Sequence, residues 1–230
     1  MLKRFLKGLI GIILLPVCAA ESIAFIHILK VLPNIGWPQA FFLGGIALYA
    51  VCFFLSFRLN LLYVFAHEAV HAIITLLCGG EVKSFHVSSR GGSVSTTKSN
   101  FIISLGPYFV PLYTILTGLA FFLLRFSVTD VYKYTNIYMF ILGFTICFHF
   151  FMTVNTLRVE QPDLTSNGYI FSLTLIFLVN IFVLAALLSV TFKEINLADF
   201  ASVFFIQTKY IALFCWDRIA AFASVFSAGS

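Results

Sequence analysis

Two histidines and a glutamate stand together in an otherwise apolar stretch, as His67-Glu68-Ala69-Val70-His71. Side chains four residues apart share one face of an α-helix, so His67 and His71 can both direct a ring nitrogen at one divalent metal ion. Glu68 follows the first histidine and can reach a metal-bound water as a general base. The spacing therefore predicts a helix that holds a zinc ion and activates water for hydrolysis.

The composition places this motif in a membrane. Of the 230 residues, 61% are hydrophobic and only 10% are charged, and the mean hydropathy is +1.03. Soluble domains carry about 25% charged residues, so this chain lacks the polar groups to cover a globule in water. The five cysteines show no C-x-x-C pattern and are expected to be small buried residues. We therefore expect an integral membrane protein.

Several apolar runs reach the roughly 20 residues that a helix needs to cross a bilayer. We expect an all-α polytopic membrane protein with about six transmembrane helices, forming a single domain over residues 1–230. The first run follows Lys3, Arg4 and Lys7 and is expected to be an uncleaved span rather than a signal peptide, because it continues past Glu21. The predicted spans are residues 8–32, 39–57, 59–78, 101–124, 135–157 and 169–192.

The tail, residues 193–230, is apolar but contains scattered charged residues. Lys209 falls in the middle of its apolar segment, which favours a C-terminal amphipathic helix at the membrane interface over a seventh span.

A polar segment follows the motif helix directly. Gly79-Gly80 is expected to end that helix, and residues 81–97 are rich in hydroxyl groups. Two β-prone runs, 82–88 and 93–97, flank the turn signal Arg90-Gly91-Gly92. We expect a short membrane-associated β-hairpin beside the metal helix, where it can admit the water that hydrolysis requires.

A catalytic zinc takes three protein ligands and keeps one position open, so the motif needs a third ligand from elsewhere. Asp163 is favoured, because a short polar loop at the boundary of a span can fold back toward the bundle and Pro162 restricts the backbone before it. Four alternatives remain open on this argument: His86, His149, Glu160 and Glu194.

Three pieces of the sequence together resemble a known family. They are His67-Glu68-Ala-Val-His71 within a span, Gly79-Gly80 followed by a hairpin, and Ser104-Leu-Gly106-Pro107 at the opening of the next span. Their types and order are similar to those of the site-2 protease family of intramembrane zinc metalloproteases, in its small, minimal branch. The resemblance covers residues 59–171.

The resemblance implies a third zinc ligand and a substrate contact. In that family the third ligand is an aspartate in a later N-x-x-P-x-P-x-L-D-G motif. Asn155 precedes Asp163 by eight residues, which is the family's spacing from Asn to Asp. The resemblance therefore assigns Asp163 to the metal and Asn155 to the substrate. Four positions depart from the motif: Arg158 and Glu160 replace the two prolines, Pro162 replaces the leucine and Leu164 replaces the glycine.

We expect a Zn²⁺-dependent metalloendopeptidase that hydrolyses membrane-anchored protein substrates in or near their transmembrane segments, with Glu68 as the catalytic base and His67, His71 and Asp163 as the metal ligands. Its expected surroundings are the lipid bilayer of the cell (inner) membrane of a bacterium. The alternative is a non-proteolytic membrane protein of the same fold that binds zinc, a partner protein or both. No basic block interleaved with aromatic residues predicts nucleic-acid binding.

Overall fold

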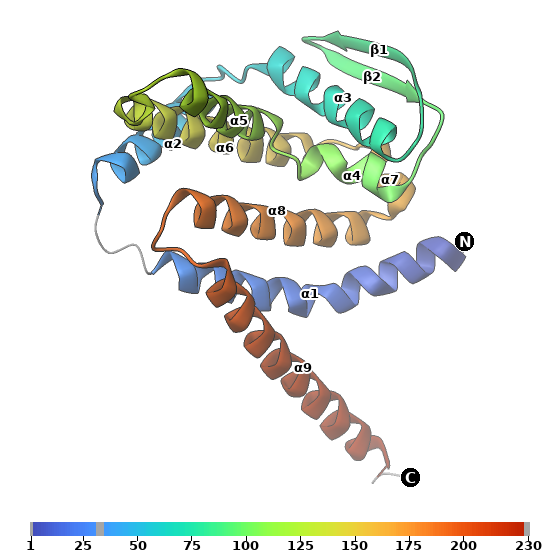
Figure 1. Cartoon of the computed structure of the whole chain (residues 1–230). Helices are drawn as coiled ribbons and strands as arrows, with labels where there is room; N and C mark the ends of the chain where they lie inside the picture. The colour runs from blue at the N-terminus through green and yellow to red at the C-terminus, as the bar shows by residue number, and fades with distance from the viewer. Residues whose placement is uncertain (1, 31–34, 228–230) are drawn as a thin grey trace. The chain divides into compact units, whose positions relative to one another are not determined.

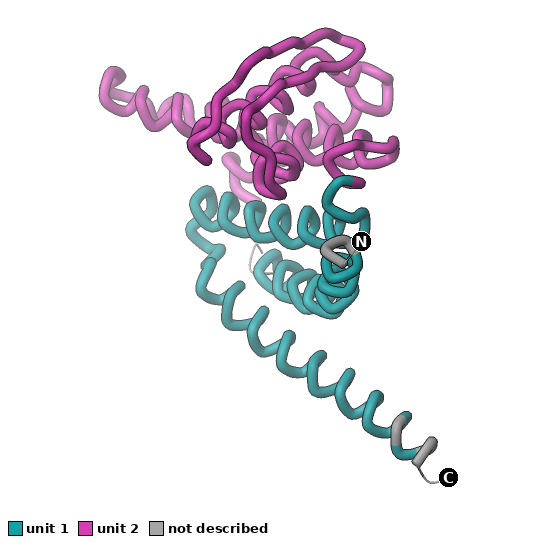
Figure 2. The backbone as a smooth tube through the Cα atoms, turned by 90° about the vertical axis from the view of Figure 1, so that its right-hand side faces the viewer, with its two compact units in different colours: residues 1–33, 166–230 teal, residues 34–165 magenta. Residues whose placement is uncertain are grey.

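The computed structural model describes residues 2–30 and 35–227. In this part of the chain the fold is mostly helical, with one antiparallel pair of strands (Figure 1). Unit 1 comprises residues 1–33 and 166–230, and unit 2 comprises residues 34–165 (Figure 2). Compact units can belong to one domain, so the single domain over residues 1–230 stays a prediction.

Unit 2 contains the motif helix α3 and most of the elements that surround it. In chain order these elements are α2 (Trp37–Phe54), α3 (Asn60–Leu77), β1 (Val82–Ser88), β2 (Gly91–Thr96), α4 (Phe101–Leu105), the 3₁₀ turn η1 (Gly106–Tyr108), α5 (Leu112–Ser127), η2 (Val131–Tyr134), α6 (Thr135–Thr156) and the start of α7 (Pro162–Asn167).

Helices α2 and α6 pack closely because each has a glycine at the contact. Gly45 faces the backbone of Phe140, and Gly143 faces the backbone of Phe42, so a side chain at either glycine would collide with a main chain. Small residues at a contact let apolar helices approach each other within van der Waals distance. The two helices therefore form a closely packed pair, the base against which the motif helix of unit 2 is positioned.

A buried cluster connects this base to the motif helix. It contains Tyr49 of α2, Tyr63 of α3, and Cys147, Phe148 and Met152 of α6. The ring of Tyr49 packs edge-on against that of Phe148, with the ring centroids 5.2 Å apart. Because Tyr63 lies one helical turn before His67, its burial in this cluster also fixes the depth and rotation of α3 at the motif.

The two glycines after α3 end the helix, as the sequence predicts. The N–H of Gly79 donates to the carbonyl of Leu76 at 2.9 Å, and the N–H of Gly80 donates to the carbonyl of Thr75 at 2.9 Å. Gly79 has φ +69°, a conformation that glycine adopts without the steric cost a side chain would add. The chain can therefore leave α3 and enter β1 within a few residues.

The hairpin forms where it is predicted, but its turn differs from the expectation. Ser88 pairs with Gly91, so the turn consists of Ser89 and Arg90, and both glycines belong to β2. The prediction that Gly91 and Gly92 form the turn is therefore wrong. Gly92 is needed in the strand, because a Cβ there would lie 2.6 Å from Cγ of Glu68.

Unit 1 consists of three long helices joined to the end of α7. Helix α1 (Leu2–Leu29) packs against both α8 (Tyr169–Thr191) and α9 (Leu197–Ser227). Nζ of Lys7 donates to Oδ1 of Asn167 at 2.7 Å, which ties α1 to the residue just before α8. The last two residues of the predicted first span, 31 and 32, lie outside the described residues.

In the described chain, six helices are long and apolar enough to cross a membrane: α1, α2, α3, α6 together with η2, α8 and α9. These helices confirm the mostly helical fold and indicate a multi-pass membrane protein; five of the six correspond to predicted spans, and the sixth, α9, belongs to the tail. The tail forms one continuous helix that meets the same criteria of length and composition, so its location at the interface stays a prediction.

The predicted span 101–124 is not one straight helix. The structure divides it into Phe101–Tyr108 and Leu112–Ser127, two segments bent by 74° to each other; counted as one span, they bring the candidates to seven. Pro111 has no N–H with which to continue a helical hydrogen-bond ladder, and Gly106 packs against Ile74 of α3 where a side chain would collide. The bend therefore brings α4 and η1 onto the motif helix.

Candidate metal centre

Helix α3 presents the two histidines of the motif on one face. Their rings lie edge to face, with centroids 4.9 Å apart, and the side chains are 11% exposed for His67 and 13% exposed for His71. Both side chains are therefore largely shielded, which suits ligands that must be held at fixed positions.

Asp163 comes to the same point from the first turn of α7. Its Oδ2 lies 3.8 Å from Nε2 of His67 and 3.4 Å from Nε2 of His71. Zinc bonds of about 2.0–2.2 Å in a tetrahedron separate neighbouring ligand atoms by roughly 3.3 Å. All three ligand atoms lie within 4.8 Å of one another, so small movements would let them hold one such ion.

The charge of Asp163 also suits a cation. Burial by itself would raise the pKa of this carboxyl, but the facing imidazoles of His67 and His71 outweigh burial and hold its pKa well below its usual range. Asp163 is therefore ionised at neutral pH and offers a carboxylate oxygen.

The ring of His71 is oriented by the neighbouring short helix α4. Nδ1 of His71 lies 2.8 Å from the carbonyl oxygen of Ile103 in α4, so the Nδ1–H donates to that carbonyl and the other ring nitrogen, Nε2, faces Asp163. The first turn of α4 is capped by Asn100, whose side chain accepts a hydrogen bond from the N–H of Ile103 at 2.8 Å. Through these two bonds, the cap of α4 helps to orient a ligand of the metal centre.

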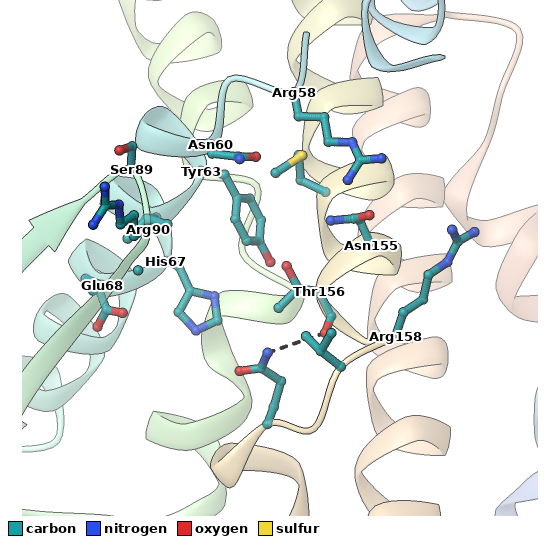
Figure 3. Close-up of a pocket in the computed structure, with 16 residues that line it drawn as sticks. Arg58, Asn60, Tyr63, His67, Glu68, Ser89, Arg90, Asn155, Thr156 and Arg158 are labelled. Carbon is teal, nitrogen blue, oxygen red and sulfur yellow. Dashed lines mark hydrogen bonds between the residues drawn. The ribbon is translucent and has the colours of Figure 1, made fainter. Parts of the chain in front are cut away.

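Glu68 lies between two open cavities. A cavity of about 380 Å³ is lined by Glu68 and all three members of the His/Asp group, together with residues of β2 that include Ser93. A larger cavity, of about 470 Å³, is lined by His67 and Glu68 and extends to the end of α6 (Figure 3). The carboxylate can therefore meet water, and the hydroxyl-rich strand lies beside the metal ligands.

Asn155 lines the larger cavity together with His67 and Glu68, although it lies on the last turn of α6 (Figure 3). Near it, the side-chain amide of Gln161 donates to the carbonyl of Thr156 at 3.5 Å, which holds the loop toward α7 against the helix end. The structure thus places Asn155 on the wall of the same cavity as the predicted catalytic base.

The alternative third ligands lie elsewhere. Among the described residues, His67, His71 and Asp163 are the only group of three or more His, Cys, Asp or Glu side chains that could hold a metal ion. His86 is exposed on β1, Glu160 is exposed before α7, and Glu194 is exposed between the helices of unit 1. His149 is buried and shares with His67 a small void lined mainly by apolar residues.

Tyr108 is a member of the site that sequence reasoning missed. Its side chain is fully buried, and its ring packs edge-on against His67 with the ring centroids 5.1 Å apart. The only signal in the sequence is its position just after Gly106-Pro107. Its burial depends on the bend after η1, which the sequence predicts only as an interruption.

The site consists of two imidazoles, a carboxylate and a buried glutamate beside two open cavities. Such a group can hold a divalent cation and take a proton from water. Comparison of the chain with family models, curated proteins and solved structures found no match.

Proposed function

We propose that the chain is an intramembrane zinc metalloprotease that hydrolyses peptide bonds of membrane-anchored proteins in or near their transmembrane segments. The observation that carries the proposal is that Asp163 of α7 meets His67 and His71 beside Glu68 on α3, a helix apolar enough to span a bilayer. The inner membrane of a bacterium remains its expected location.

His67, His71 and Asp163 would hold the zinc ion. When bound, zinc supplies a water of lowered pKa, near about 7, and polarises a carbonyl group. Glu68 would accept the proton of the attacking water and deliver it to the amine that leaves. Asn155, on the wall of the larger cavity, would hydrogen-bond the substrate chain on one side of the cut.

The substrate must be extended where it is cut, because a helix hides its carbonyl groups within its own hydrogen bonds. Strand β2 lines the cavity that contains the His/Asp group, through Gly92, Ser93, Val94 and Thr96. A two-stranded sheet leaves one edge of each strand unpaired, and such an edge binds an extended segment by strand addition. The substrate segment would therefore lie along β2, next to Glu68.

One feature favours a second candidate function. Arg158 and Glu160 stand where the related motif has prolines, so the loop that delivers Asp163 is altered relative to that family. A non-proteolytic membrane protein that keeps zinc, or a partner-binding surface, would fit this change. The two candidates differ in whether Glu68 is required.

The test compares wild-type protein with Glu68→Gln and with Glu81→Gln, an exposed glutamate beyond the end of α3 that serves as the matched control. Each form is expressed as the full chain, and new N-termini in the cell's membrane proteins are identified by chemical labelling. Removing a general base costs about 10²- to 10⁴-fold in rate, so cuts near transmembrane segments should appear with wild type and Glu81→Gln only.

Zinc content should be equal in the three forms, since Glu68 is not a ligand. Equal cleavage with Glu68→Gln, or no new N-termini with any form, would favour the non-proteolytic alternative.

A further inference from the structure

Three arginines from three separate loops line the larger cavity. Arg58 precedes α3, Arg90 is in the hairpin turn and Arg158 follows α6. Figure 3 shows Arg58 and Arg158 on the right of the cavity and Arg90 on the left, near Glu68. The arginines thus lie around the space that leads to the predicted catalytic base.

None of these arginines forms an ion pair with a carboxylate within the described ranges 2–30 and 35–227. Arg58 instead lies over the ring of Phe53, 5.3 Å from its centroid. By contrast, Nζ of Lys133, in η2, pairs with Oδ2 of Asp130 at 2.7 Å. The only acidic residue that lines the cavity is Glu68, so its lining carries an excess of positive charge.

We propose that this cavity binds acidic side chains of the substrate segment, so that the arginines select aspartate or glutamate close to the cut. The proposal rests on the proposed function. A guanidinium group binds a carboxylate through two parallel hydrogen bonds, and Arg90 lies across the cavity from Arg58 and Arg158, so an acidic residue can meet an arginine on either side.

A peptide fits this cavity better than a lipid headgroup does. The amides of Asn60, Asn155 and Gln161 line the same space, and amides can pair with an extended peptide backbone. His67 and Glu68 also line it, so a segment bound there lies next to the reacting groups. A substrate chain in this position lies beside Glu68, whereas a lipid phosphate there would obstruct the approach to it.

The experiment measures peptide binding without cleavage. The full chain carrying Glu68→Gln is purified in a neutral detergent and titrated into fluorescein-labelled ten-residue peptides that differ only in two central positions, Glu, Gln or Lys. We expect the glutamate peptide to bind more tightly than the glutamine peptide, and the difference to shrink at high salt.

Changing Arg58, Arg90 or Arg158 singly to Gln should weaken binding of the glutamate peptide by roughly three- to ten-fold and leave the glutamine peptide unaffected. Arg158→Glu should shift the preference toward the lysine peptide. Arg125→Gln is the matched control, because Arg125 contacts Tyr132 and does not line the cavity. Circular dichroism and zinc content establish that each variant is folded.

Equal affinities for the glutamate and glutamine peptides would overturn the proposal. So would arginine variants that weaken binding of short-chain phosphatidylglycerol but not of the glutamate peptide, which would assign the cavity to lipid headgroups. Because the variant background does not cleave, the two tests can fail separately: loss of charge selectivity removes this inference and leaves the proposed enzyme, whereas absence of new N-termini removes the enzyme and leaves at most a cavity that binds acidic peptides.

Discussion

Gly92 of β2 lies so close to Glu68 that any side chain there must displace one of the two. A Cβ at Gly92 would lie 2.6 Å from Cγ of Glu68 and 2.8 Å from Cγ1 of Val64. We predict that Gly92→Ala lowers cleavage by roughly 100-fold, because misplacing a reacting group by about 1 Å has an effect of that size. The zinc content should stay unchanged, since no ligand is moved.

The control for this substitution is Gly118→Ala, at a helical glycine where an added Cβ meets nothing within 4 Å. Cleavage of a membrane-anchored reporter in cells reports the activity of both variants. If Gly92→Ala is as active as Gly118→Ala, the hairpin does not determine the position of Glu68.

At the residue scale, the sequence predicts those positions that depend on local periodicity. His67 and His71 share a face because a helix repeats every 3.6 residues, and this needs no knowledge of the fold. Asp163 is favoured over other acids and histidines by loop position and by resemblance, and only the path of the chain from α6 to α7 brings it to the histidines. Tyr108 could not be predicted, because its burial results from packing between distant elements.

At the scale of elements, the short helix α4 orients His71 and depends on its own cap. We predict that Asn100→Ala, which removes a cap that contributes about 1 kcal/mol, loosens the carbonyl of Ile103 that holds Nδ1 of His71. Loss of a partner that orients a ligand lowers metal affinity by roughly 10- to 100-fold. Competition with a chromophoric chelator measures the zinc affinity of the full chain in detergent.

A second asparagine offers a matched control. The side chain of Asn196 accepts a hydrogen bond from the N–H of Ala198 at 2.8 Å, at the start of α9 in unit 1. Asn196→Ala removes the same kind of bond and should leave zinc affinity unchanged. Equal losses for both substitutions would mean that general destabilisation, rather than orientation of His71, explains the effect.

The sequence predicts these elements better than it predicts their geometry. Two β-prone runs and a glycine pair predict a hairpin over residues 82–97, but the two-residue turn Ser89-Arg90 depends on the strand register, which places Gly92 in β2 beside Glu68. Prolines and glycines predict an interruption in the span 101–124. The 74° bend could not be derived from them, because its angle depends on how α4 and η1 pack on α3.

At the scale of the whole molecule, six apolar helices predict how the protein behaves toward a bilayer. We expect the chain to remain in the membrane pellet after extraction with alkaline carbonate and to dissolve only in detergent. Apolar helices of this length are stable in lipid, and exposing them to water is unfavourable. Release by carbonate would mean that the apolar helices lie on the membrane or against other proteins instead of crossing it.

A multi-pass membrane protein could be predicted from composition alone, because a chain of this length with only 10% charged residues cannot cover the surface of a water-soluble globule. The convergence of Arg58, Arg90 and Arg158 on one cavity could not, because their positions in the chain are 32 and more residues apart and each looks like an ordinary loop cation. Their common location emerges only when α3, the hairpin and the end of α6 are folded together.

The most direct test of the metal centre is the zinc content of the purified full chain, measured by atomic emission after dialysis. We predict one zinc ion per wild-type chain and per His149→Ala chain, and a loss of most zinc from Asp163→Ala, because Asp163 lies with His67 and His71 while His149 does not. Full zinc in Asp163→Ala together with loss of zinc in His149→Ala would contradict this ligand set.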